Sequence, residues 1–234
     1  MIECKHKLFP KLTFANEEEK QTFYDYLEFK GLFLHKHVYE AFLLYKDIVT
    51  YHELSTYIRY DKGLRNVLYR NLSAVEEYYR ARLINNYDVK DPIQDPINSS
   101  VDKSDLIESN EETSNLYNFT FSKKFTFNKL IELLKSKGLI TKLEEDALNQ
   151  IRIFRNKVMH HNLIIISYHT EEEKIENEIK EIESYCELIY QYLPRPMKNA
   201  FEGNINKCNH LTVKSRVPNL EILCLKEMKN GLFG

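Results

Sequence analysis

The chain has 234 residues, of which 43% are hydrophobic and 29% are charged. These proportions predict a folded protein with a sizeable core, and the low count of 6 Gly and 6 Pro disfavours a turn-rich all-β fold. Lys and Arg number 33 against 35 Asp and Glu. This balance argues against a protein that coats nucleic acid through a general basic excess, although a local basic patch is compatible with it.

In the first half of the chain, helix-capping signals and apolar spacing predict helices. Asn16 followed by Glu19 forms a capping box that opens a helix ending near residue 29. Apolar residues at helical spacing predict a second helix over 37–48, which resumes over 52–57.

A long helix is expected to start at Asp61 and to end near Asn85. Glu76 and Arg80 stand four residues apart on it, as an ion pair requires. Its apolar residues recur every three or four positions and predict one buried stripe: Leu64, Val67, Leu68, Leu72, Val75, Tyr79 and Leu83.

The second half begins with a polar segment, 91–115, that we expect to be a flexible loop. Helices follow over 127–137, from a Thr141–Glu144 capping box to about residue 161, and from Thr170 to the prolines at 194 and 196. The tail from residue 198 to 234 is weakly patterned, with a short helix expected over 219–229.

These elements together predict an all-α fold, a single domain over 1–234 with about five to seven helices in a bundle. The loop at 91–115 would be a polar insertion and 198–234 a C-terminal extension. The four cysteines form no CxxC pair, and no secretory signal or apolar run of the ~20 residues that span a bilayer is present. We therefore expect a cytoplasmic protein with reduced thiols and no membrane partner.

The run Arg155-Asn156-Lys157-Val158-Met159-His160-His161-Asn162 carries the clearest chemistry. A permanent cation and two titratable imidazoles can neutralise a phosphate and move protons near neutral pH without a metal. At 100° per residue, Arg155 falls at the edge of the apolar arc made by Leu143, Ala147, Ile151, Phe154 and Val158. A charge there is costly unless it is paired or faces a ligand.

The spacing of Arg155 and His160 is compatible with a structural role and with a functional site. An Arg and a His near a helix C-terminus often stabilise exposed carbonyls and the helix dipole. In a straight helix His160 would lie about 140° around the helix axis from Arg155, so the two side chains would not point to the same place. They can act on one ligand if the helix ends or bends near Met159, if the Arg side chain wraps around the helix, or if two chains share the site.

Arg155-Asn156-x-x-x-His160 resembles the R-N-x-x-x-H signature of HEPN-domain ribonucleases, and the doubled His160-His161-Asn162 resembles the bacterial abortive-infection (Abi) branch. The pattern Asp61-x-x-Leu64-Arg65, followed by Glu76 and Arg80, is similar to the long helix of Abi proteins. The resemblance covers roughly residues 35 to 195. Met159 and Leu163-Ile164 depart from the Abi pattern on either side of the histidines.

The resemblance implies a homodimer with a shared cleft, an RNA substrate and a metal-independent endoribonuclease that needs no cofactor. It implies Arg155 and His160 as catalytic residues. Asn156 and His161 would support them. It also implies a toxin or phage-defence effector under the control of a partner, an RNA or a protein inhibitor. Arg65, Glu76 and Arg80 would contact RNA or form a structural charge network.

Other functions are weaker. A non-catalytic HEPN module could bind RNA, a nucleotide or a partner protein, and the motif could be a coincidence in a helical protein. A metal site is disfavoured because the adjacent His160 and His161 point apart on a helix. Cys208-Asn209-His210 offers only one Cys and one His, in a weakly patterned tail. Neither a Gly-rich phosphate loop nor a GxSxG motif is present.

Overall fold

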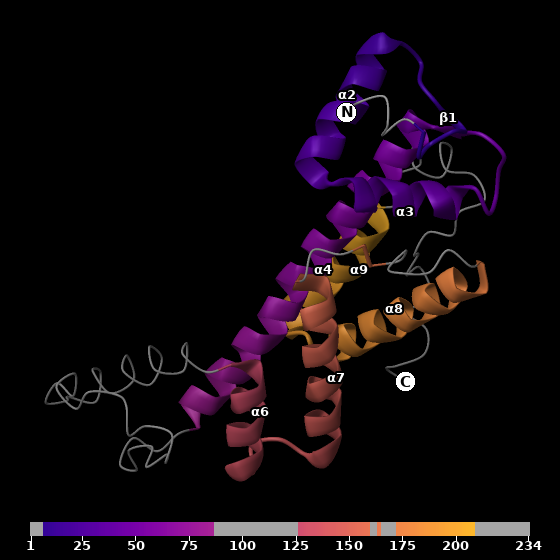
Figure 1. The fold of residues 1–234 in the computed structure, drawn as a ribbon. Helices are drawn as coiled ribbons and strands as arrows, with labels where there is room; N and C mark the ends of the chain where they lie inside the picture. The colour runs from indigo at the N-terminus through magenta and orange to yellow at the C-terminus, as the bar shows by residue number, and fades with distance from the viewer. Residues whose placement is uncertain (1–6, 87–125, 160–162, 165–171, 209–234) are drawn as a thin grey trace, which may run out of the picture. The chain divides into compact units, whose positions relative to one another are not determined.

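The computed structural model describes residues 7–86, 126–159, 163–164 and 172–208 (Figure 1). Within these ranges the chain forms seven helices and one pair of two-residue strands, which confirms the predicted all-α fold of five to seven helices. The described elements are β1 (Leu12–Thr13), α2 (Glu17–Lys30), α3 (Leu32–Phe42), β2 (Val49–Thr50), α4 (Tyr51–Asn85), α6 (Phe127–Ser136), α7 (Lys142–Met159), α8 (Glu172–Tyr192) and α9 (Arg195–Cys208).

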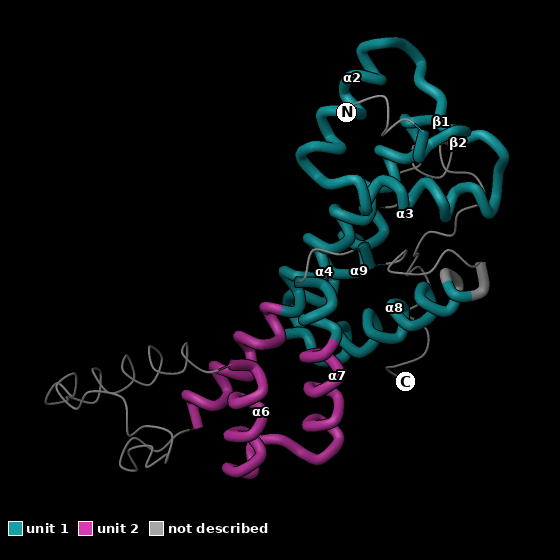
Figure 2. The backbone as a smooth tube through the Cα atoms, in the orientation of Figure 1, with its two compact units in different colours: residues 1–72, 154–234 teal, residues 73–153 magenta. Residues whose placement is uncertain are grey.

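The chain gathers into two compact units, and α4 and α7 each contribute to both (Figure 2). Unit 1 comprises residues 1–72 and 154–234, and unit 2 comprises residues 73–153. The single-domain organisation over 1–234 stays a prediction. No described helix is long and apolar enough to cross a lipid bilayer.

Unit 1 has an aromatic core around Phe23 of α2, which is fully buried. The Phe23 ring meets Phe9 edge-on at 5.2 Å between centroids, and Tyr51 at the start of α4 at 5.3 Å. β1 and β2 pair in parallel with Leu12 opposite Val49, and the Tyr39 hydroxyl accepts a hydrogen bond from the Lys11 backbone N–H at 2.9 Å. These contacts join the N-terminal segment to α2, α3 and the first turn of α4.

Unit 2 is built on the hairpin of α6 and α7, joined by residues 137–141, together with the last part of α4 (Figure 1). Gly138 ends α6 with a φ of 65°, the left-handed conformation that glycine adopts without strain. The predicted Thr141–Glu144 capping box is present, since Thr141 Oγ1 accepts from the Glu144 N–H and Glu144 Oε2 accepts from the Thr141 N–H. Side chains buried in this unit include Leu130, Leu134, Leu148 and Ile151.

The predicted start of the long helix at Asp61 is wrong, because α4 begins at Tyr51. Thr50 Oγ1 accepts from the Glu53 N–H at 3.2 Å and Glu53 Oε2 accepts from the Thr50 N–H at 2.9 Å. This second T-x-x-E capping box was legible in the sequence. The predicted 52–57 segment is therefore the first part of α4, and Asp61 lies buried inside the helix. The predicted stripe is buried, apart from a half-exposed Val67.

Three further expectations need correction. Pro196 does not only stop α8, because it lies in the first turn of α9, where proline is tolerated. Phe201 and Ile205 of α9 are buried, so the first part of the predicted C-terminal extension belongs to the folded unit. On α7, Leu143 is 71% exposed although it was expected on the buried arc, because it lies in the first turn. The predicted 91–115 loop and 219–229 helix lie outside the described residues.

Candidate functional site

A groove of about 750 Å³ opens in unit 1 at the C-terminal end of α7. We call it the α7-end groove. Three parts of the unit line it. From α2 and α3 come Phe29, Lys30, Phe33 and Leu34; from α4 come Lys62, Arg65, Asn66 and Tyr69; from the end of α7 and just beyond come Val158, Met159 and Leu163.

The Asp61 carboxylate anchors one wall of this groove to another. Asp61 is fully buried in α4, and its Oδ1 accepts a hydrogen bond from the backbone N–H of Ile164 at 2.8 Å. Its Oδ2 accepts from Arg65 Nε at 2.9 Å. A buried carboxylate is stable only when such donors compensate for the water it has lost. The segment that follows the His160-His161-Asn162 run is therefore fixed to α4 by a charge-assisted hydrogen bond.

Arg155 lies on α7 one turn before Met159, and residues four apart share a helix face. Its face is therefore the one that carries Met159, a lining residue of the groove. Arg155 is half-buried and Asn156 is exposed. Phe154, the residue before Arg155, is fully buried and stacks on Tyr185 of α8, with 4.3 Å between ring centroids and 8° between ring planes.

His160 and His161 lie outside the described residues. In sequence they come between Met159 and Leu163, both of which line the groove. The described helix ends at Met159, so the angular argument for a straight helix applies only up to that residue. Lys157, between Arg155 and Met159, faces α8, where its Nζ stands 3.6 Å from Glu181 and 3.9 Å from Glu178.

The three residues assigned to RNA contact or to a charge network fall in different places. Arg65 lines the α7-end groove and pairs with Asp61, so it takes part in both the wall and its anchor. Glu76 and Arg80 belong to unit 2 and form the predicted i,i+4 ion pair at 2.7 Å, with both side chains mostly buried. Their geometry is that of a structural pair. Within the described residues, no group of three or more His, Cys, Asp and Glu side chains is arranged so that it could hold a metal ion.

Sequence reasoning missed the wall made by α2 and α3. Phe29 is 76% exposed and Phe33 is 65% exposed, on either side of Gly31, whose φ of 88° turns the chain between the two helices. Two phenylalanines four residues apart normally indicate a buried stripe. Their exposure was not legible, since it depends on which neighbours cover that side of the helices.

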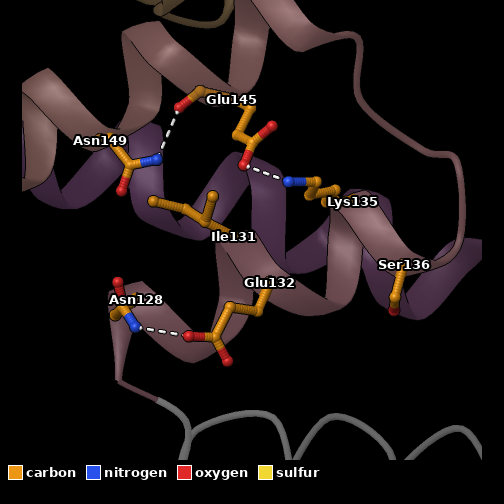
Figure 3. A pocket seen from close by; sticks show the side chains of 7 residues that line it. All are labelled: Asn128, Ile131, Glu132, Lys135, Ser136, Glu145 and Asn149. Atoms are coloured by element: carbon orange, nitrogen blue, oxygen red, sulfur yellow. Dashed lines mark hydrogen bonds and ion pairs between the residues drawn. The ribbon is translucent and has the colours of Figure 1, made fainter.

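A second hollow, of about 520 Å³, lies in unit 2 between α6 and α7. Figure 3 shows that its charged and amide side chains pair with one another: Lys135 Nζ donates to Glu145 at 2.8 Å, and Asn128 Nδ2 donates to Glu132 at 2.7 Å. Asn149 Nδ2 donates to the Glu145 carbonyl at 3.0 Å. We call this hollow the unit 2 pocket. Its polar groups are already satisfied by the hairpin that forms it.

Comparison with known proteins gives one family match. The model of a domain of unknown function, DUF4145, matches residues 112–209, which is less than half of the chain. The matched stretch contains α6 to α9 and therefore Arg155, but not the walls contributed by α2, α3 and α4. No curated protein and no solved structure matches this chain.

Proposed function

We propose that this protein is a metal-independent endoribonuclease of the HEPN type, with its active site at the α7-end groove. The observation that carries the proposal is the position of this groove. It lies where α7 ends, at Met159 one turn after Arg155, and it is lined by Lys30, Lys62 and Arg65 without an acidic side chain among its described lining residues. Cations and aromatic rings beside a motif of Arg and His suit a phosphodiester with attached bases.

The chemistry follows from the residue types. A base removes the proton from a ribose 2′-hydroxyl, the 2′-oxygen attacks the adjacent phosphorus, and the bond to the leaving 5′-oxygen breaks as an acid protonates that oxygen. The products are a 2′,3′-cyclic phosphate and a 5′-hydroxyl. In this proposal His160 carries the protons, and Arg155 holds the phosphate and offsets the charge that develops on it.

Two protomers would share the site. One chain supplies one His160, whereas the reaction needs both a base and an acid, and a homodimer in which two α7 ends approach each other supplies the pair. Asn156, exposed on α7, would orient the phosphate or an imidazole, and His161 would support His160. Arg65, held by Asp61, would keep the groove in shape.

The proposed role of the protein in the cell rests on its resemblance to Abi proteins alone. A cytoplasmic nuclease of this type would act as a toxin or phage-defence effector, held in check by an RNA or protein inhibitor. Expression of the protein without that inhibitor would then slow growth, and Arg155→Ala would restore it.

The test is RNA cleavage by the purified full chain in EDTA, with His160→Ala and His161→Ala as a neighbouring pair. We expect His160→Ala to lower the rate about 10²- to 10⁴-fold, the usual size of general acid–base catalysis, and His161→Ala to lower it far less. A 2′-O-methyl RNA should resist cleavage because it lacks the attacking hydroxyl. Full activity of His160→Ala would refute the assigned mechanism.

The shared site has its own test. An excess of His160→Ala protein mixed with wild-type protein should form mixed dimers and suppress the cleavage rate. If the rate per wild-type subunit is unaffected while exchange of subunits is verified, the site belongs to one chain.

A non-catalytic HEPN module is the second candidate, because the described features of the groove suit binding whether or not a bond is broken. It predicts retention of RNA, a nucleotide or a partner without cleavage. His160→Ala would then leave binding unchanged.

A further inference from the structure

Several exposed large hydrophobic side chains, three of them aromatic, line the α7-end groove. Of the twelve exposed large hydrophobic residues in the described part of the chain, four line it. They are Phe29 at 76% exposure, Phe33 at 65%, Tyr69 at 45% and Met159 at 36%. Scattered exposed apolar residues need no explanation, whereas several around one groove indicate a binding surface.

One face of the Phe33 ring packs against a buried side chain. It stacks on His37, one turn further along α3, with 5.3 Å between centroids and 16° between planes. His37 is itself only 7% exposed, so its ring is fixed in the core of unit 1. Phe33 is therefore an oriented aromatic surface, and a flat ligand can add to the stack at little cost in side-chain entropy.

The charges of the groove select the class of ligand. Lys30 lies over the Phe29 ring at 4.5 Å, and Arg65 is paired with Asp61. Lys62 is exposed and makes no ion pair with a described residue, so its charge is available to a ligand. With no carboxylate among the described lining residues, the groove favours an anion that also presents flat rings.

Unpaired nucleotides meet both requirements. Each carries a phosphate and a base with two open faces, and proteins bind single strands by stacking bases on aromatic side chains along a basic groove. Bases inside a duplex have their faces covered by their neighbours and cannot reach such a stack. The groove volume of about 750 Å³ is within the range of small-ligand sites.

We propose that the α7-end groove is a stacking subsite for unpaired nucleotides of RNA, with one base on Phe33, another on Tyr69 and the intervening phosphate on Lys62. The inference rests on the proposed function for the choice of RNA, and it adds that the enzyme selects single-stranded segments through these side chains. An acidic peptide rich in aromatic residues is the other ligand class that the lining would accept.

The chain contains no Trp, which gives the stacking proposal a direct test. Phe33→Trp places a single indole at the stacking position, and Tyr78→Trp places one at an exposed position of α4 that does not line the groove. Both proteins are titrated with a 2′-O-methyl hexanucleotide, which cannot undergo 2′-hydroxyl attack. We expect saturable quenching of fluorescence in the Phe33→Trp protein and none in Tyr78→Trp, and no quenching by a duplex of the same sequence.

Tyr69 and Tyr78 form a matched pair for affinity, since both lie on α4 and are 45% and 44% exposed. Tyr69→Ala should weaken hexanucleotide binding about tenfold, and Tyr78→Ala should leave it unchanged. Equal quenching at both tryptophan positions, equal loss in both alanine variants, or binding of the duplex as tightly as the single strand would overturn the proposal. So would the absence of any hexanucleotide binding, which would favour the acidic peptide.

The outcomes separate this inference from the nuclease assignment. Cleavage of RNA in EDTA without quenching in the Phe33→Trp protein would refute the stacking subsite and leave the nuclease standing. Saturable quenching without cleavage by wild-type protein would support the subsite and refute the nuclease.

Discussion

The α7-end groove and the unit 2 pocket are both lined in part by α7, but they differ in how many of their polar side chains are paired with described residues. In the unit 2 pocket, Lys135 is bonded to Glu145 and Asn128 to Glu132 (Figure 3). In the α7-end groove, Lys62 is exposed and makes no ion pair with a described residue, and three aromatic rings are exposed. The paired side chains of the unit 2 pocket leave little charge for a ligand, whereas the exposed lysine and rings of the α7-end groove are the features on which the proposed site rests.

Each unit also holds a carboxylate that joins a helix to another segment of the chain, and the two carboxylates differ in burial. Asp61 in unit 1 is fully buried and takes the Ile164 N–H and Arg65. Glu144 in unit 2 is 20% exposed at its side chain and takes Arg82 Nη1 at 2.8 Å and the Tyr79 hydroxyl at 3.2 Å. The first fixes a wall of the candidate site, and the second holds the hairpin to α4.

The largest contrast should come from two arginines one turn apart on α7. Arg155 belongs to unit 1 and Arg152 to unit 2, where its Nε donates to Asn149 at 3.4 Å. We expect Arg155→Ala to lower the RNA cleavage rate by about 10²-fold or more, as loss of a donor to a developing oxyanion does, and Arg152→Ala to have little effect. Single-turnover cleavage measures both. Equal rates for the two variants would contradict a role for Arg155.

Removing the Asp61 carboxylate should cause the next largest effect. Asp61→Ala leaves Arg65 and the Ile164 N–H without their acceptor, and we expect the free energy of unfolding to fall by about 3 kcal/mol. Urea denaturation followed by circular dichroism measures it. Arg65→Ala should cost less, because Asp61 then keeps the Ile164 hydrogen bond. A loss below about 1 kcal/mol for Asp61→Ala would show that the anchor is weak.

Lys62 of the α7-end groove and Lys135 of the unit 2 pocket should respond differently to removal of their charge. Lys62→Ala should weaken binding of a single-stranded oligonucleotide several-fold and reduce its log–log dependence on salt by about 0.7, the value for one phosphate contact. Lys135→Ala should change neither quantity, because Glu145 already neutralises Lys135. Fluorescence anisotropy across a salt series gives both numbers. An unchanged slope for Lys62→Ala would remove that lysine from the phosphate contact.

The smallest expected effect is a pH dependence in unit 2. Burial alone would raise the pKa of Glu144, but the Thr141 N–H and the Arg82 guanidinium outweigh it and hold the pKa below its ordinary value. The ionised carboxylate therefore stabilises the fold fully above the unfolded-state pKa of about 4.3, and this contribution is lost as the pH falls through the lower folded-state pKa.

Urea titrations at pH 6 and near pH 3 can measure this contribution. Wild-type protein should exceed Glu144→Gln by about 1 kcal/mol at pH 6, and the difference should shrink toward pH 3. Glu77→Gln, an exposed position on α4, is the control and should show no difference at either pH. A gap between wild type and Glu144→Gln that widens in acid would contradict the assigned sign.

Local signals in the sequence determined most of the helices. The capping residues Asn16 and Thr141 act as predicted, and Thr126 caps α6 in the same way, because a side-chain oxygen three residues before an unsatisfied N–H needs no tertiary partner to bond it. The same local rule could have placed the start of α4 at Thr50. Pro196 misled the prediction of α9, since a proline ends one helix or begins the next depending on the residues around it.

Only the tertiary structure decided which residues meet. Asp61 and Ile164 are 103 residues apart in the chain, and their bond depends on how the end of α7 packs on α4. The exposure of Phe29, Phe33 and Lys62 depends in the same way on which described residues lie beside them. Sequence by itself determined most of the helices and the order of residues in the Arg–His run at 155–162, because both are local. It left undetermined the groove beside that run, because a groove is made by segments that the chain brings together only when it folds.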